Sequence, residues 1–310
     1  MGESPFTSAQ AVKLLDKNIT KYYWDRYTGL PMIIDKIYDR MKSKKAWEEF
    51  QGVGSLPDPQ PFNGVIQMQN FSMQYHTKIV PLEYAGGFIL ERRLIDTDQS
   101  GIVKKLPQQL AVAANRKMNK IAHEPFIYPD SAAFTFQTSE EGVALASNSH
   151  LTKAADVSTS SGFDNLATYG FDPANLEALR LQGMGFRDDI GERITPNFDT
   201  IVHGSTLAGS VDEAINSTSK ISQDNPGVKN IQKGRWTSLE LPMLDDYSTT
   251  GWGIIDSNAM KDALIWVDAV PLEFNTPPLD YDHMMRKYQD YFVCAWGFTD
   301  WRWIVWSDPA

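Results

Sequence analysis

The chain has 310 residues and a mass of 34.9 kDa, so it can bury a core large enough to be stable without disulfide bonds or a structural metal ion. Its 42% hydrophobic and 22% charged residues lie in the ordinary range of globular proteins and exclude disordered and collagen-like chains. A formal net charge of −10 argues against a protein whose main function is to bind nucleic acid, because that affinity depends on clustered Lys and Arg.

Charge is distributed unevenly along the chain. Residues 1–120 hold 17 Lys and Arg against 12 Asp and Glu, whereas the remaining residues hold 12 against 27. The only cysteine is Cys294, which excludes an intramolecular disulfide. The amino terminus lacks a basic segment followed by an apolar core, and no run of about 18 apolar residues occurs. We therefore expect synthesis in the cytoplasm and no contact with a membrane.

The first 50 residues predict two helices, over 8–24 and 31–50, the second with Pro31 in its first turn. Four apolar residues of the second helix follow the i, i+3, i+4, i+7 spacing of one stripe: Ile34, Ile37, Tyr38 and Met41. Such an amphipathic arm either lies on a partner or caps the core of its own chain.

Residues 52–64 form the densest cluster of Gly and Pro and are predicted to be a loop. The β-prone residues from Val65 to Leu90 then predict long antiparallel strands with a kink at 85–87. Both faces of this ribbon mix polar and apolar side chains, so its own fold is not expected to bury it on both sides. We expect the ribbon to project from the body or to lie across another molecule.

The longest predicted helix covers residues 101–123, with Pro107 tolerated only in a first turn. Its apolar residues define one predicted buried stripe: Ile102, Leu106, Leu110, Ala113, Met118 and Ile121. Polar residues occupy the opposite side: Gln108, Asn115, Lys117 and Lys120. The helix is therefore expected to pack by one face only.

Beyond residue 124 the sequence predicts extended loops with short strands as far as residue 164. Asp172 before Pro173 predicts an N-capped helix that ends near Gly183, and a short helix is predicted from Ser205. A strand is predicted over 194–202 between these two helices.

The last third predicts alternating strands and turns and contains seven of the nine tryptophans. It ends in a predicted strand pair around a turn at 297–300. Phe292, Cys294 and Trp296 share one strand face, and Trp301, Trp303 and Val305 share a face of the return strand.

Catalytic patterns are weak throughout. Ser147, Asn148, Ser149 and His150 adjoin, but they lack the flanking glycines of a nucleophile elbow. The five histidines have no metal-ligand spacing, and one cysteine cannot build a thiolate cage. Adjacent acids at 188–189 and 245–246 are more typical of solvated caps than of acid–base pairs. We expect no enzyme activity and assign no catalytic, cofactor or metal residue.

The remaining features are a mixed-face ribbon, an amphipathic arm, a helix that packs by one face and an aromatic terminal sheet. They indicate a protein whose uncovered surfaces are completed by copies of itself. The expected contacts between subunits are Ile34, Tyr38, Met41, Phe62, Met68, Phe71, Met73 and Tyr75.

The order of these elements resembles the major capsid proteins of tailed bacteriophages with the Hong Kong 97 fold, especially Mu-type head subunits. The clearest similar stretch is KIVPLEYAGGFILERRLIDTDQSGIVKKLPQQLAVAANRKMNKIA, residues 78–122, in which Asp96 and Asp98 stand at the family's acidic turn before its long spine helix. The segment ALASNSHL at 144–151 and the helix, turn and strand over 171–204 are also similar.

The resemblance implies an α+β fold of the Hong Kong 97 type. Its expected parts are an N-terminal arm (1–51), an extended β-hairpin loop (52–85), a peripheral domain with the spine helix (86–129), an axial domain (130–260) and terminal strands that return to the peripheral domain (261–310). The resemblance further implies a major capsid protein that self-assembles through pentamers and hexamers into an icosahedral shell around double-stranded DNA.

The implied location is the virion, after assembly in the host cytoplasm. The expected partners are identical subunits, a separate scaffolding protein, since no charged leader precedes the arm, and portal and decoration proteins. Packaged double-stranded DNA is expected to be contacted weakly, because an acidic interior would let it slide.

Three alternatives stay open at this point. The same fold forms encapsulin compartments, which hold enzymes instead of genomes. A soluble hydrolase would use Asp188, Asp189 and His203. A saccharide-binding tail or decoration protein would use the terminal tryptophans.

Overall fold

Within the residues that the computed structural model describes, twelve strands form three sheets. The described residues are 8–64, 66, 68, 72–97, 101–131, 137–154, 157–219, 229–276 and 285–309. The α-helices are α1 (Ser8–Thr28), α2 (Ile34–Ile37), α3 (Arg92–Asp96), α4 (Ile102–Ile127), α5 (Pro173–Gly183), α6 (Ala208–Asn216) and α7 (Ser257–Ala263). Two 3₁₀ turns are η1 (Ser205–Leu207) and η2 (Pro242–Asp246). The expected α+β class is confirmed.

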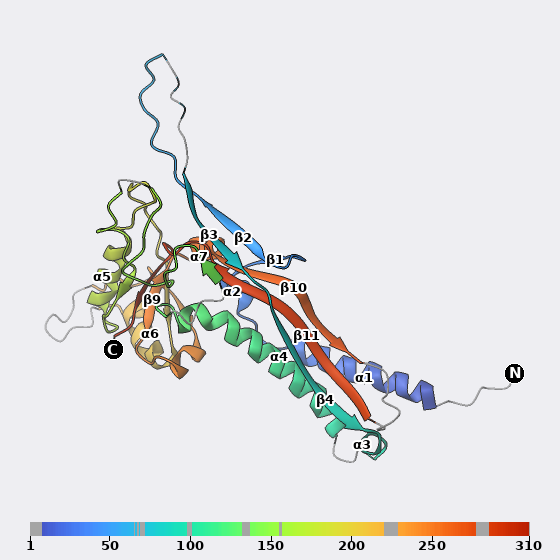
Figure 1. Ribbon diagram of the computed structural model, residues 1–310. Helices are drawn as coiled ribbons and strands as arrows, with labels where there is room; N and C mark the ends of the chain where they lie inside the picture. Colours follow the sequence, from blue (N-terminus) through green and yellow to red (C-terminus); the bar gives the residue numbers. More distant parts are fainter. Residues whose placement is uncertain are drawn as a thin grey trace.

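A long four-stranded sheet has the order β1-β10-β11-β4. Its strands are β1 (Asp39–Lys42), β4 (Leu82–Glu91), β10 (Leu264–Asn275) and β11 (Met285–Phe298). α4 runs along this sheet and α1 packs against α4 (Figure 1). The Tyr23 hydroxyl of α1 donates to Asp290 of β11 at 3.2 Å, and the Tyr23 ring stacks on Phe274 of β10 at 4.4 Å. Ile19 and Tyr23 of α1 are buried, and Asp16 accepts a hydrogen bond from Tyr288, so this face of α1 is held by its own chain.

The second sheet, of five strands, has the order β6-β12-β9-β7-β8. Its strands are β6 (Leu166–Ala167), β7 (Thr200–His203), β8 (Thr237–Glu240), β9 (Trp252–Ile255) and β12 (Ile304–Ser307). α5 and α6 lie beside it in the part of the molecule that contains the carboxyl terminus (Figure 1). The third sheet, β2-β3-β5, consists of β2 (Glu48–Val53), β3 (Met73–Ile79) and β5 (Gln137–Ser139).

The predicted helix over 31–50 is wrong. Only one turn, α2, is helical, and the chain then enters β1, which pairs in parallel with β10, and β2, which pairs with β3. Ile34, Ile37 and Tyr38 of the predicted stripe are buried in the main core, and this single turn accounts for their helical spacing. Tertiary pairing with strands far along the chain decides the conformation of the residues that follow.

The predicted kink at 85–87 is absent, because β4 continues through both glycines in regular register with β11. The glycines instead allow close approach. A Cβ on Gly86 would lie 2.7 Å from a carboxylate oxygen of Asp290, and one on Gly87 would lie 2.7 Å from the carbonyl oxygen of Tyr288. The break in the strand lies before β4, at Val80 and Pro81, where the chain leaves one sheet for the other.

The long helix is confirmed, but its predicted buried face is wrong over the first three turns. The buried residues are Val103, Pro107, Ala111, Ala114, Asn115, Met118, Ile121, Ala122, His123, Pro125 and Phe126. The stripe therefore starts one residue later than predicted and joins the predicted one at Met118. Small residues on the buried face let α4 lie close to the long sheet. Pro107 lies beyond the first turn and is accommodated on this packed face.

Local signals are reliable between residues 166 and 263. Asp172 accepts a hydrogen bond from the Ala174 backbone at 3.2 Å and caps α5, as predicted. η1 and α6 follow from Ser205. The predicted strand over 194–202 shrinks to β7, and α7, which is capped by Asp256, was not predicted.

The terminal strands do not pair with each other as predicted. β11 pairs with β10 and β4, whereas β12 pairs with β6 and β9. The chain crosses from one sheet to the other between them, and Trp301 and Trp303 are buried at the crossing. One cluster of buried residues extends from Ile37 and Met118 beside the long sheet to Trp306 in the five-stranded sheet. The two sheets therefore share one core.

None of the helices in these described ranges is both long and apolar enough to cross a bilayer.

Candidate subunit interface

The hairpin of β2 and β3 projects from the body of the molecule. The two strands pair antiparallel, with Glu48 opposite Ile79 and Gln51 opposite His76. Between the strands, the described residues 54–64, 66 and 68 extend far beyond the long sheet and the five-stranded sheet (Figure 1). The breaker residues among them explain why they form no regular structure of their own. The hairpin therefore presents a long surface that most of its own chain does not touch.

Exposed apolar side chains concentrate on this hairpin. Of the 14 large hydrophobic residues that are exposed in the described part of the chain, eight lie between residues 47 and 80: Trp47, Val53, Leu56, Phe62, Ile66, Met68, Met73 and Val80. Phe62 is 76% exposed and Met68 is 89% exposed. Contiguous exposed apolar surface is typical of protein–protein contact sites. We refer to these eight residues as the hairpin apolar set.

The expected contact residues differ in how exposed they are in the structure. Phe62, Met68 and Met73 belong to the hairpin apolar set, and Met41 and Tyr75 are half-buried. Phe71 lies outside the described residues, as does Asp98 of the acidic turn.

Ile34 and Tyr38 were expected to contact a neighbouring subunit, and this expectation is wrong. Both are buried in the core of their own chain, and the Tyr38 hydroxyl donates to the Ala122 carbonyl oxygen at 3.2 Å. Because α4 already covers them, their side chains are not available to a neighbouring subunit.

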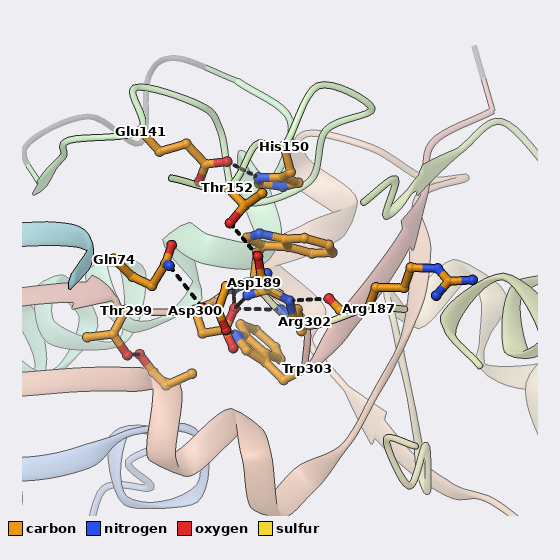
Figure 2. A network of polar contacts seen from close by, with 12 residues as sticks. Gln74, Glu141, His150, Thr152, Arg187, Asp189, Thr299, Asp300, Arg302 and Trp303 are labelled. Atoms are coloured by element: carbon orange, nitrogen blue, oxygen red, sulfur yellow. Dashed lines mark hydrogen bonds and ion pairs between the residues drawn. The ribbon is translucent and has the colours of Figure 1, made fainter. Parts of the chain in front are cut away.

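A buried carboxylate fixes the base of the hairpin. Asp189 is 7% exposed and accepts hydrogen bonds from the Ser55 backbone N–H and from Gln74 Nε2, both at 2.9 Å. Ser55 follows β2 and Gln74 belongs to β3, so these donors come from the two sides of the hairpin. Figure 2 shows Gln74 beside Asp189. Thr152 donates to the Asp189 carbonyl oxygen at 2.9 Å and ties the same turn to the loop after β5. Gly54 has no room for a side chain, because a Cβ there would lie 2.6 Å from Ser72 Oγ.

A second group of contacts holds the loop that meets β3. Lys153 donates to Glu140, and His76 Nδ1 lies 2.8 Å from the same carboxylate. Bonding to Lys153 is the main cause that lowers the pKa of Glu140 to about 2. Deeper in the loop, His150 contacts Glu141 at 3.1 Å and stacks on Trp301 at 4.2 Å between ring centroids. The hairpin base is thus tied to the aromatic core (Figure 2).

The hydrolase reading is not supported by this geometry. Asp188 and Asp189 line a groove of about 690 Å³ between the hairpin and the body, but His203 does not line it. His203 is buried in β7 and bonds to Ser238 Oγ and the Gly204 carbonyl oxygen, both at 2.7 Å. Asp188 accepts from the Ile190 and Glu192 backbone N–H groups and closes its own turn.

The other candidate motifs also have structural roles. Asp245 accepts from the Thr206 backbone N–H at the start of η1, which makes it a cap. The hydroxyls of Ser147 and Ser149 bond to each other at 2.8 Å within a turn. Among the described residues, no group of three or more His, Cys, Asp or Glu side chains is arranged to hold a metal ion.

The terminal tryptophans are core residues, which overturns the saccharide-binding reading. All seven tryptophans after residue 235 are at most 6% exposed. The Trp303 indole donates to the Asp300 carbonyl oxygen at 2.8 Å, and the Arg302 guanidinium lies 4.8 Å from the Trp301 ring centroid. Their faces are occupied by their own chain, so no sugar ring can stack on them.

Two elements of the site escaped the sequence analysis. The first is the clamping role of Asp189, because the partners Ser55 and Gln74 are more than a hundred residues away in the chain. The second is the rest of the hairpin apolar set, which was not expected to form contacts: Trp47, Val53, Leu56, Ile66 and Val80. A usable signal for Leu56 was its place as an apolar residue within a Gly/Pro loop.

The comparisons with known proteins identify the family of the chain and its fold. Residues 75–307 match the sequence model of a family described as phage capsid protein. No curated protein sequence matches the chain.

Solved structures with a similar fold include the procapsid of bacteriophage JBD30, with a TM-score of 0.51, 13% identity and coverage of 97% of this chain and 76% of that chain. The cyanophage Pam1 capsid has a TM-score of 0.54 at 9% identity and covers 87% of each chain. The capsid of Myoviridae phage XM1 has a TM-score of 0.51 at 11% identity and covers 89% of this chain and 91% of that chain. At these identities, the likeness establishes a shared fold.

Proposed function

Because this chain belongs to the phage capsid protein family, we propose that it is the head subunit that assembles through pentamers and hexamers into an icosahedral shell around double-stranded DNA. A role as a bacteriophage capsid protein follows from the family itself. The ring sizes, the closed shell and its content are the proposed part.

The observation that carries the proposal is the hairpin apolar set. A single chain gains nothing from holding Phe62 and Met68 in water, since burial of one such side chain stabilises by about 1.5–3 kcal/mol. The clamp at Asp189 orients the hairpin away from its own body, so the apolar side chains find cover on a neighbouring copy. A heterologous contact of this kind generates rings when the rotation closes.

The parts of the chain fit this arrangement. In the proposal, residues 52–85 reach across a neighbour, and residues 86–129 and 261–310 form the peripheral domain around α4. Residues 130–260 form the axial domain at the ring centres, and residues 1–51 form the arm. A separate scaffolding protein, a portal and decoration proteins are the further proposed partners.

The experiment replaces three exposed apolar residues, Phe62→Ser, Met68→Ser and Met73→Ser, in one variant. Since their side chains are already in water, the thermal unfolding midpoint of the unassembled chain should stay within about 2 °C of wild type. Assembly, followed by sedimentation and electron microscopy with the scaffolding protein present, should be lost. The matched control, Phe62→Leu, Met68→Leu and Met73→Leu, keeps the apolar surface and should still assemble.

A wild-type chain that remains a monomer near 35 kDa at high concentration with its scaffold would contradict the proposal. A serine variant that assembles as well as wild type would show that the hairpin apolar set is not the contact.

A further inference from the structure

One exposed face of α4 is uniformly basic or neutral. Residues 101–123 contain five Lys and Arg and no Asp or Glu. Lys105, Gln109, Val112, Arg116 and Lys120 follow one another at spacings of four, three, four and four. This spacing places them on a single helix face. All but Val112 are exposed, and Val112 is half-buried.

The adjoining helix completes a groove on this face. Arg26, near the end of α1, lines a groove of about 530 Å³ together with residues of α4 that include Lys105, Gln109 and Arg116. None of the three cations, Arg26, Lys105 and Arg116, makes an ion pair or hydrogen bond through its side chain with any residue in the described ranges. Three unpaired cations therefore line one groove in a protein whose net charge is −10.

The composition of the groove distinguishes between classes of occupant. Cores of protein–protein interfaces are depleted in Lys and enriched in aromatic residues and Met, but this groove has only Val112 and Ala113 as apolar members. Phosphate contacts, by contrast, come from Arg and Lys and from polar side chains such as Gln, which supply the rest of the lining. A phosphate backbone is the occupant that this chemistry fits.

The length of the groove suits a duplex. Lys105 and Arg116 are eleven residues apart, which corresponds to about 16 Å along a helix axis. Double-stranded DNA carries one phosphate about every 3.4 Å per strand, so the groove spans about five base pairs.

We propose that the groove between α1 and α4, with Arg26, Lys105 and Arg116, binds the phosphate backbone of double-stranded DNA without regard to sequence. This inference rests on the proposed shell function, which supplies the DNA. It makes the expectation of weak contact with packaged DNA specific: contact is restricted to one basic groove per subunit, and the acidic surface elsewhere keeps that contact weak.

The test is binding of a fluorescent 20-base-pair duplex of random sequence to wild-type protein at several salt concentrations. The groove variant carries Arg26→Gln, Lys105→Gln and Arg116→Gln. With three phosphate contacts removed, the slope of log Kobs against log salt should become shallower by about 2.7, since each contact contributes about 0.9. The control variant, Lys36→Gln, Lys44→Gln and Lys261→Gln, removes the same charge at exposed positions and should change the slope by less than about 1.

Equal slopes for the two variants would overturn the groove as the DNA site. Competition by polyglutamate as strong as by duplex, at equal charge, would also overturn it, because an acidic polypeptide would then be the better occupant. Assembly of each variant is scored in parallel by sedimentation. Wild-type shells that form without binding duplex would reject the groove but leave the shell proposal intact, whereas failure of wild type to form shells would reject the shell proposal.

Discussion

Glu124, near the end of α4, has a carboxyl group whose negative charge is disfavoured by burial. It lines a cavity of about 270 Å³ with Tyr84, Tyr247 and Trp296, and the Trp296 indole donates to its carboxylate at 2.7 Å. Burial raises the pKa of Glu124 from 4.5 to about 7, although the Trp296 hydrogen bond and the charge of Lys117 act in the opposite direction. Below about pH 7 the neutral acid is therefore favoured in the folded protein.

The raised pKa of Glu124 predicts a pH-dependent stability. Between about pH 4.5 and 7 the folded chain keeps a proton that the unfolded chain has lost, so stability decreases as pH rises through this window and is constant above it. Relative to Glu124→Gln, the free energy of unfolding of the unassembled wild-type chain should fall by on the order of 2 kcal/mol between pH 5 and pH 8. Urea titrations at the two pH values measure this difference.

The control for that measurement is Glu49→Gln, which changes an exposed carboxyl group. Its pH profile should follow wild type. Parallel profiles for wild type and Glu124→Gln would show that the carboxyl of Glu124 is solvated in the folded chain.

At the scale of elements, the packing of α4 depends on small residues. Ala111 is fully buried, and Leu110 beside it leans on β4, 3.2 Å from the place that a Cβ of Gly86 would take. The predicted stripe of larger side chains from Ile102 to Leu110 is only half-buried. Close approach of the helix to the sheet, which periodicity does not encode, selects the face with Ala111 and Ala114.

The observed face of α4 predicts the effect of added volume. Ala111→Leu should destabilise the chain by about 1–3 kcal/mol, because a packed interior cannot absorb three extra carbons without strain. Gln109→Leu, on the exposed face, should change the free energy of unfolding by less than about 0.5 kcal/mol. Denaturant unfolding of both variants distinguishes the two faces, and equal costs would show the assigned face to be wrong.

The contacts of Asp189 at the base of the hairpin predict how a substitution there changes local stability. Asp189→Asn removes the charge that accepts from Ser55 N–H and Gln74, so the local opening free energy at Ser55 should fall by about 1–3 kcal/mol. Native-state hydrogen exchange of the Ser55 amide measures it. Asp188→Asn is the matched control, since that carboxylate contacts only its own turn. Unchanged exchange in Asp189→Asn would contradict the clamp.

On the scale of the whole molecule, the chain has the Hong Kong 97-type fold that its element order resembles. The long sheet and the five-stranded sheet share one core, while the hairpin stands outside it (Figure 1). The hairpin is therefore the described part of the chain that this core does not cover.

The reactivity of the Cys294 thiol measures how tightly this shared core is packed. It is buried on β11, and burial, with a smaller contribution from Asp268, raises the pKa of its thiol to about 12. Since only the thiolate reacts, alkylation by iodoacetamide at pH 8 should be at least about 10³-fold slower in the folded chain than in guanidinium. An exposed cysteine, Ser160→Cys in a Cys294→Ala background, should react at the same rate in both. Fast labelling of native Cys294 would mean that β11 is not packed as described.

Much of the fold was predictable wherever the signal was local. Three signals depend only on neighbouring residues: Asp172 before a proline, the helix start at Ser205 and the breaker cluster at 52–64. The structure confirms the cap, α6 and the projecting loop. The predictions of a helix over 31–50 and of a terminal hairpin were wrong. The reason is that β1 and β12 pair with strands that their own sequence does not identify.

Composition and periodicity predict an aromatic core, a long helix and a ribbon too mixed to be buried, because both depend on side-chain chemistry along the chain. The packed fold alone shows which face of α4 is buried, that Asp189 clamps the hairpin, and that Arg26 lies across a groove from Lys105 and Arg116. Those relations join residues far apart in the chain, and distance in space is fixed by how the sheets and helices pack together.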